Sequence, residues 1–125
     1  MRNAYEIWVT KMMESWKNLE GRNTAYLFSS DVEYYEALDA PPCTTWEDVA
    51  DLWIVVPENQ RDIDYSFEII CADENCAIVN WKMKRLFISD LKTISQVIDG
   101  IFQIKLNNEE KCTFFKQWRF TKNGG

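Results

Sequence analysis

One absence limits the chemistry that this chain can carry out: its 125 residues include no His. Imidazole is the commonest general base of enzymes, and the Ser-His-Asp and Cys-His arrangements both depend on it. The sequence therefore excludes these two kinds of nucleophilic catalyst. Any acid–base chemistry would fall to carboxylates and phenols.

Four cysteines offer a second candidate chemistry, at Cys43, Cys71, Cys76 and Cys112. The spacing of Cys71 and Cys76 is not that of a usual zinc pair, and no imidazole is present to complete a site. Disulfides are rare in the reducing cytoplasm, where we expect this protein. We therefore expect reduced, partly buried thiols, no metal and no other cofactor.

The stretch CTFFKQWRF, residues 112–120, alternates like a strand but has apolar groups on both faces. One face carries Cys112, Phe114, Lys116, Trp118 and Phe120; the other carries Thr113, Phe115, Gln117 and Arg119. A strand with one face in water concentrates its apolar side chains on the other face, so both faces here must be covered. Arg119 is either an exposed charge at a rim or an anchor for an anionic ligand.

Length and composition predict a single domain over residues 1–125. The net charge of −6 argues against a nucleic-acid partner, which requires a basic surface. No apolar run approaches the roughly 18 residues of a membrane span. The first residues, MRNAYEIW, also lack the apolar core of a signal peptide. We expect a cytoplasmic protein that binds neither nucleic acid nor a membrane.

Two helices are predicted near the start of the chain. From Tyr5 to Glu20 the apolar residues follow a helical spacing and form one broad stripe. Gly21 is the expected C-cap of this helix. Asn23 can cap a short second helix that runs to Phe28.

One short strand and a third helix are predicted next. Residues 31–38 alternate as a strand, which the APP turn then ends. Thr44 or Thr45 can cap the third helix, because Glu47 then lies in its first turn, where the helix dipole favours a carboxylate. Pro57 is expected to end this element.

The rest of the chain is interpreted as four long antiparallel strands, at residues 62–71, 76–87, 97–106 and 111–121. The preferred register has a three-residue turn that pairs Ala72 with Cys76 and places Phe67 beside Trp81. A four-residue turn is the alternative, which the packing pattern disfavours. Helices followed by antiparallel strands are typical of an α+β domain.

Four segments together resemble the SnoaL-like branch of the nuclear transport factor 2-like superfamily, over nearly the whole chain. They are ESWKNLEGRNTAYLFSSDVEYYE, the APP turn with the helix after it, AIVNW, and VIDGIFQIKLNNEEKCTFFKQWRF. The resemblance implies an α+β, cone-shaped half-barrel, in which a curved, mostly antiparallel sheet wraps around three N-terminal helices. Close relatives end the last strand with Glu-Trp-Trp, where this chain has Gln-Trp-Arg and so gains a cation in place of a carboxylate.

The resemblance does not fix an activity, because this fold carries isomerases, cyclases, epoxide hydrolases, dehydratases and pure binding modules. The pattern of the steroid-isomerase relatives places Glu36 at their catalytic base, a role that a carboxylate in an apolar cone could serve. Their acidic proton donor falls on Phe102 of this chain. Tyr5, Tyr26 or Tyr65 would have to replace it.

The open end of the cone is the expected site for a small apolar or anionic molecule. Pairing Leu106 with Lys111 puts Phe102 and Arg119 on the same side of the last hairpin, which the family comparison makes the concave side. Glu36 is the candidate catalytic residue. The candidate ligand-binding residues are Trp16, Tyr34, Trp53, Tyr65, Trp81, Phe102, Gln117 and Arg119.

The convex side of the sheet carries Ile101, Phe114 and Trp118, an apolar set that indicates an interaction surface. Members of the superfamily commonly dimerise through this face, so we expect a homodimer. Three functions stay open: small-molecule binding, a cofactor-free isomerase, lyase or cyclase with Glu36 as base, and a structural or partner-binding module. A cavity of roughly 300–1,000 Å³ would favour the first two, and a cone filled with side chains the third.

Overall fold

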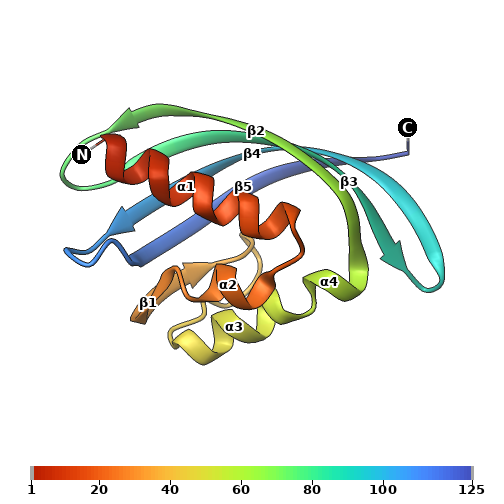
Figure 1. The fold of residues 1–125 in the computed structure, drawn as a ribbon, viewed down its shortest axis with the longest axis horizontal. Coiled ribbons are helices and arrows are strands. Elements are labelled where there is room, and N and C mark those ends of the chain that lie inside the picture. Colours follow the sequence, from red (N-terminus) through yellow and green to blue (C-terminus); the bar gives the residue numbers. More distant parts are fainter. Residues whose placement is uncertain (1, 125) are drawn as a thin grey trace.

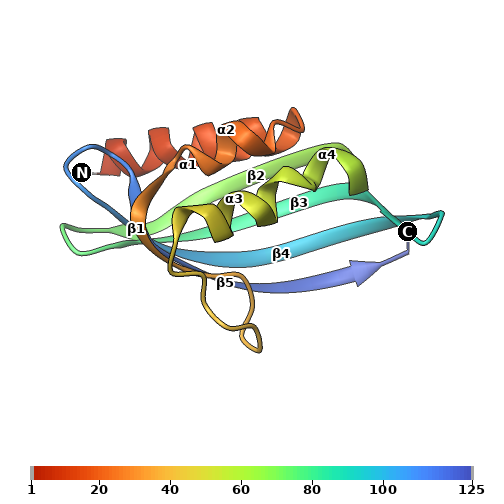
Figure 2. The same ribbon diagram turned by 90° about the horizontal axis from the view of Figure 1, so that it is seen from below.

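The computed structural model describes residues 2–124 and consists, over this range, of four helices and five strands. In chain order they are α1 (Arg2–Lys17), α2 (Gly21–Ala25), β1 (Phe28–Tyr35), α3 (Trp46–Ile54), α4 (Val56–Asn59), β2 (Gln60–Ala72), β3 (Ala77–Ser89), β4 (Lys92–Leu106) and β5 (Cys112–Asn123). One curved sheet has the order β1-β5-β4-β3-β2, and all helices lie on its concave side (Figures 1 and 2). The predicted α+β half-barrel is confirmed, with one helix more than expected.

Helix α1 lies along the concave face of the sheet (Figure 1). Its predicted apolar stripe is buried, at Tyr5, Trp8, Val9, Met12, Met13 and Trp16. The helix ends earlier than expected, because Leu19 adopts the left-handed region with φ 60° and the Glu20 N–H donates to the Ser15 carbonyl at 2.8 Å. The assignment of Gly21 as its C-cap is therefore wrong.

Gly21 instead allows α2 and α3 to pack closely. A Cβ atom at this position would lie 1.8 Å from the carbonyl oxygen of Trp53, so the contact requires a residue without a side chain. The predicted cap of α2 at Asn23 is wrong, because the helix begins at Gly21 and contains Asn23. Helix α2 ends at Ala25, three residues before the predicted end, because Phe28 already begins β1.

The third predicted helix is found as α3, and its cap is Thr45. The hydroxyl of Thr45 accepts a hydrogen bond from the Asp48 N–H at 3.2 Å. Pro57 does not end the helical segment. It lies in the first turn of α4, where its missing N–H costs no hydrogen bond, and this short helix leads directly into β2.

The preferred pairing of β2 with β3 is confirmed at its centre, where Phe67 pairs with Trp81, but not at the turn. Ala72 pairs with Ala77 rather than Cys76, across a four-residue turn. The register shifts between Ile69 and Cys71, so one extra residue of β2 is absorbed. A bulge thus reconciles the longer turn with the predicted pairing of the aromatic residues.

The two faces of the last hairpin divide as predicted over most of its length, although the expected pair of Leu106 with Lys111 is wrong, because Leu106 pairs with Cys112. Phe102 pairs with Gln117 on the concave side, and Ile101 pairs with Trp118 on the convex side. Cys112 departs from the prediction, because the register shift between Lys105 and Leu106 moves this thiol to the concave, fully buried face. Burial raises the pKa of the Cys112 thiol, which favours the neutral form.

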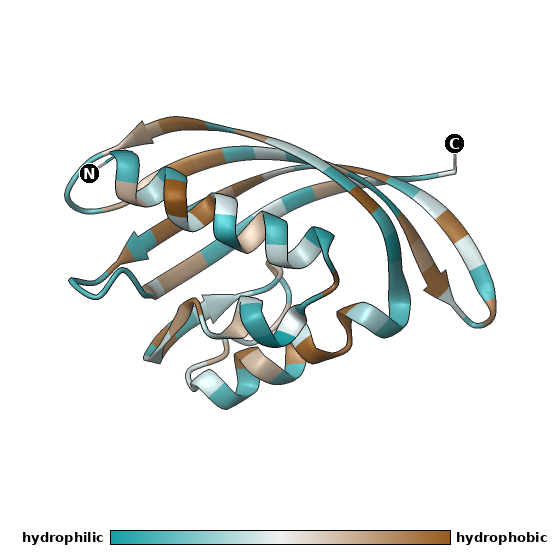
Figure 3. Ribbon diagram, in the orientation of Figure 1, coloured by the Kyte–Doolittle hydropathy of each residue, from teal (hydrophilic) through white to brown (hydrophobic). Residues whose placement is uncertain are grey.

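The hydrophobic core fills the space between α1, the other helices and the concave face. Hydrophobic and hydrophilic segments alternate along α1 and along the strands, as expected for elements with one buried face (Figure 3). None of the helices in residues 2–124 has both the length and the apolar character needed to cross a bilayer.

Candidate functional site

A cavity of about 110 Å³ opens between the helices and the concave face of the sheet. Its wall is formed by α1, the residue after β1, the α3–α4 segment, the start of β2, and strands β3 to β5. The lining residues are Met12, Trp16, Glu36, Leu52, Trp53, Val56, Gln60, Arg85, Phe87, Phe102, Phe115, Gln117 and Arg119. This volume lies below the range of roughly 300–1,000 Å³ because aromatic side chains fill much of the cone, so size alone does not favour a ligand pocket over a filled cone.

The aromatic filling is formed by stacked and tilted rings. Trp81 stacks on Phe102 with 4.8 Å between ring centroids, and Tyr34 stacks on Phe115 at 4.9 Å. Phe102 and Phe115 are tilted against each other, at 4.9 Å. These rings close one side of the cavity and give it a rigid apolar wall.

Arg85, on β3, is the most buried cation of the wall, with only 6% of its surface exposed. Its Nε donates to Gln96 Oε1 at 2.8 Å, and its guanidinium lies 5.2 Å from the Phe87 ring centroid. Within residues 2–124 the single ion pair closer than 4.0 Å is that of Lys17 and Asp64, so Arg85 has no carboxylate at contact distance.

The charge of Arg85 is therefore poorly compensated. Burial, followed by the positive charge of Arg119, lowers the pKa of Arg85 to about 10, while the charge of Glu36 acts in the opposite direction. Arg85 still carries its proton at neutral pH. A buried charge of this kind is costly unless an opposite charge or several hydrogen bonds meet it.

Glu36 lies one residue beyond the end of β1, half-buried on the cavity wall. The hydroxyl of Tyr34 donates to Glu36 Oε2 at 2.5 Å. Burial, followed by the charge of Glu36, raises the pKa of Tyr34 well above its usual value, so the phenol stays neutral. Backbone hydrogen bonds of 2.9 and 2.8 Å between Tyr34 and Cys43 fix the strand end that carries this pair.

Gln117 and Arg119 reach the cavity from successive inward positions of β5. Gln117 is buried, and its Oε1 has no hydrogen-bond partner among the described residues. Arg119 is exposed, which places its charge at the mouth. The cavity thus changes from apolar at the ring wall to cationic at the opening.

No protein-family model matches this sequence. The curated proteins contain no match to it either. A solved structure with a similar fold is that of a ketosteroid isomerase-like protein from Erwinia carotovora atroseptica, with a TM-score of 0.72 and 10% identity over 92% of each chain. The chain has a nuclear transport factor 2-like fold. At this identity the likeness extends to the fold alone.

The cone of this fold gathers most of the residues that the sequence proposed for a site. Glu36 lines the cavity together with five of the predicted ligand-binding residues, namely Trp16, Trp53, Phe102, Gln117 and Arg119. Tyr34 lies behind Glu36 rather than on the wall, and Trp81 lies behind Phe102. Both are fully buried, so they position the lining residues and do not border the open space.

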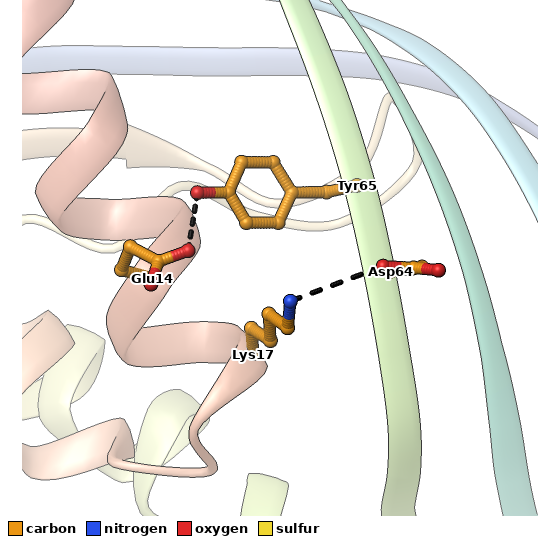
Figure 4. Close-up of polar contacts among 4 residues, drawn as sticks. All are labelled: Glu14, Lys17, Asp64 and Tyr65. Atoms are coloured by element: carbon orange, nitrogen blue, oxygen red, sulfur yellow. Dashed lines mark hydrogen bonds and ion pairs between the residues drawn. The ribbon is translucent and has the colours of Figure 1, made fainter.

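Tyr65 lies outside the cavity. It points from β2 toward α1, where its hydroxyl donates to Glu14, beside the Lys17–Asp64 ion pair (Figure 4). Partial burial and the bond to Glu14 raise the pKa of Tyr65 to about 12. This phenol joins α1 to the edge strand.

Arg85 is the main lining residue that the sequence did not assign to the pocket. A signal was available, because Trp81 was proposed as a lining residue and the alternation of β3 continues through Met83 to Arg85 and Phe87. Val56 belongs to α4, a helix that was not predicted, whereas Leu52 lies on the predicted helix α3 but was not proposed as a lining residue.

Proposed function

We propose that this chain is a small-molecule-binding domain whose ligand occupies the cavity of the cone. The observation that supports this most strongly is the convergence of Glu36, Arg85 and Arg119, from three separate segments, on one cavity between the helices and the sheet. A core that serves stability alone has no need of a buried guanidinium, since apolar residues of similar volume stabilise as well or better.

Blocking the mouth tests this proposal. Leu52 is 40% exposed and lines the cavity, whereas Ile54 on the same helix is 53% exposed and does not. We expect Leu52→Trp to remove binding of small molecules, as seen by native mass spectrometry of the purified protein and by thermal-shift screening. The matched variant Ile54→Trp should bind like the parent. Equal binding by the two variants, both folded, would contradict the proposal.

A second candidate function is proton abstraction from the bound molecule by Glu36, as an isomerase, lyase or cyclase would require. What favours it is the hydrogen bond from Tyr34, which orients Glu36 on the wall and leaves Oε1 without a hydrogen bond to the described residues. If Glu36 is a base, a ligand with an acidic C–H should exchange deuterium in the parent protein and not in Glu36→Gln. Equal exchange by both would eliminate this function.

We also propose that the chain forms a homodimer through the convex face of the sheet. Ile101, Phe114 and Trp118 are only half-buried there, and Phe120 beside them is 78% exposed. Apolar groups gathered on one face are typical of an interface. We expect sedimentation to give a dimer for the parent and a monomer for the double variant Phe114→Lys, Trp118→Glu. A parent that is monomeric at high micromolar concentration would contradict the dimer.

A further inference from the structure

We propose that the cavity binds a small monocarboxylate, whose carboxylate group is held between Arg85 and Arg119 and whose apolar part lies against the aromatic wall. This inference rests on the proposed function, because it concerns the same cavity, and it adds the chemical class of the ligand. Four observations carry it: the free donors of Arg85, the charge of the wall, the apolar lining and the volume.

The first observation concerns the donors of Arg85. Its single hydrogen bond to the described residues uses Nε and reaches a neutral amide, that of Gln96. The guanidinium also lies over the Phe87 ring. The two terminal nitrogens form the flat fork that binds a carboxylate through two parallel hydrogen bonds. An anion in the cavity would supply the counter-charge that this buried group lacks.

The second observation concerns the charge of the wall. The lining contains one acidic residue, Glu36, and two basic residues, Arg85 and Arg119, which gives a formal net charge of +1. One oxygen of Glu36 already accepts a hydrogen bond from Tyr34. A ligand with a single negative charge neutralises the wall, whereas a doubly charged phosphate would leave one negative charge in excess.

The third and fourth observations concern the shape and size of the ligand. Met12, Val56, Phe102 and Phe115 contribute carbon atoms to the lining beside the charged groups, and an aliphatic chain packs against such atoms more favourably than a hydrated inorganic anion does. The volume of about 110 Å³ is somewhat smaller than a cavity of about 150 Å³ that accepts benzene. An aliphatic acid with a chain of three to five carbons, such as butanoate, is therefore the appropriate size.

Calorimetric titration with butanoate and with butanamide, its neutral analogue of nearly equal shape, tests the carboxylate directly. We expect butanoate to bind about tenfold or more tightly than butanamide, because charge-assisted hydrogen bonds to a guanidinium are lost in the amide. Across the series from acetate to hexanoate, affinity should pass through a maximum and then fall when the chain outgrows the cavity. Inorganic phosphate should bind more weakly than butanoate.

Variants assign the effect to Arg85. Arg85→Gln should weaken butanoate binding about tenfold or more while leaving butanamide binding unchanged. Lys84→Gln is the matched control, since it removes one positive charge at the next residue of β3, which is exposed and outside the cavity. Arg85→Lys keeps the positive charge but loses the forked pair of donors, so its affinity for butanoate should lie between those of the parent and Arg85→Gln. Circular dichroism checks that each variant is folded.

The outcomes separate this inference from the proposed function. Three results would overturn the inference that the ligand is a carboxylate: equal affinity for butanoate and butanamide, tighter binding of phosphate than of butanoate, or an Arg85→Gln variant that binds butanoate as tightly as the parent. Each of them would still leave the proposal of a small-molecule cavity in place. If neither butanoate nor butanamide binds, the carboxylate inference is likewise overturned. The proposed function falls only if closing the mouth with Leu52→Trp changes no small-molecule binding.

Discussion

Two regions of the same cone differ in what their inward-facing side chains do. Near the start of β5, Trp8 and Phe28 meet edge to face at 5.5 Å, and Phe28 meets Phe115 in the same way at 5.6 Å. Further along the sheet, the inward positions carry Arg85, Gln117 and Arg119 around the cavity. Both regions follow the same alternation of strands, but one is tightly packed and the other borders a cavity.

The difference indicates where to look for function in such a domain. In the packed region each apolar group is covered by another, and the gain is stability. In the cavity region Arg85 and Gln117 are buried although they are polar, which costs stability unless something pairs with them. Buried polar side chains at the open end therefore indicate the candidate site better than aromatic residues do, because aromatic residues occur in both regions.

The largest expected effect comes from breaking the packed region. We expect Phe28→Ala to lower the free energy of unfolding by about 3–5 kcal/mol, because it removes a buried ring that Trp8, Tyr34 and Phe115 all contact. Urea denaturation measures this loss. Leu38→Ala, at a position that is 74% exposed, is the control and should change stability by about 0.5 kcal/mol at most. Similar losses in both would show that the region is not tightly packed.

A smaller effect of opposite sign is expected in the cavity region. Replacing the buried guanidinium by an apolar side chain of similar length, in Arg85→Met, should raise the free energy of unfolding by about 1 kcal/mol, since it removes an uncompensated charge. The same variant should lose butanoate binding. A loss of several kcal/mol in the ligand-free protein would instead identify Arg85 as part of the structural framework.

The smallest effect concerns pH and Tyr34, which lies between the two regions. Its pKa is raised in the folded protein, so the neutral phenol contributes stability below the unfolded pKa of about 10 and loses it as the pH rises through the folded pKa. Tyr34→Phe cannot ionise and should lose less stability than the parent above about pH 10. Urea denaturation on both sides of that pH measures this, and parallel profiles would contradict it.

The elements and their inward faces were largely predictable from the sequence. The apolar stripe of α1, the cap at Thr45 and the pairing of Phe67 with Trp81 all follow from local patterns, and the structure has each of them. Phe102 and Arg119 were expected on one side of the last hairpin, and both line the cavity. Alternation fixes the face of a strand residue because the side-chain period is two.

Depth along the cone and local irregularities were not predictable. Alternation does not tell whether an inward position lies in the packed region or beside a cavity, so Trp81 and Phe102 were given the same role. Bulges shift the period by one residue, which moved Cys112 to the buried face. Leu19 ends α1 with a positive φ, a conformation that favours glycine. Because a Leu occupies this position, the C-cap was wrongly assigned to the nearest glycine, Gly21.

The most direct test of the central claim is a nuclear magnetic resonance titration that follows the six Trp indole N–H signals as butanoate is added. Trp16 and Trp53 line the cavity, whereas Trp118 lies on the convex face. We expect the signals of Trp16 and Trp53 to shift in a saturable way and that of Trp118 to stay constant, and Arg85→Gln should need about tenfold more butanoate for the same shifts. Shifts confined to Trp118, or none at all in the parent protein, would contradict the account.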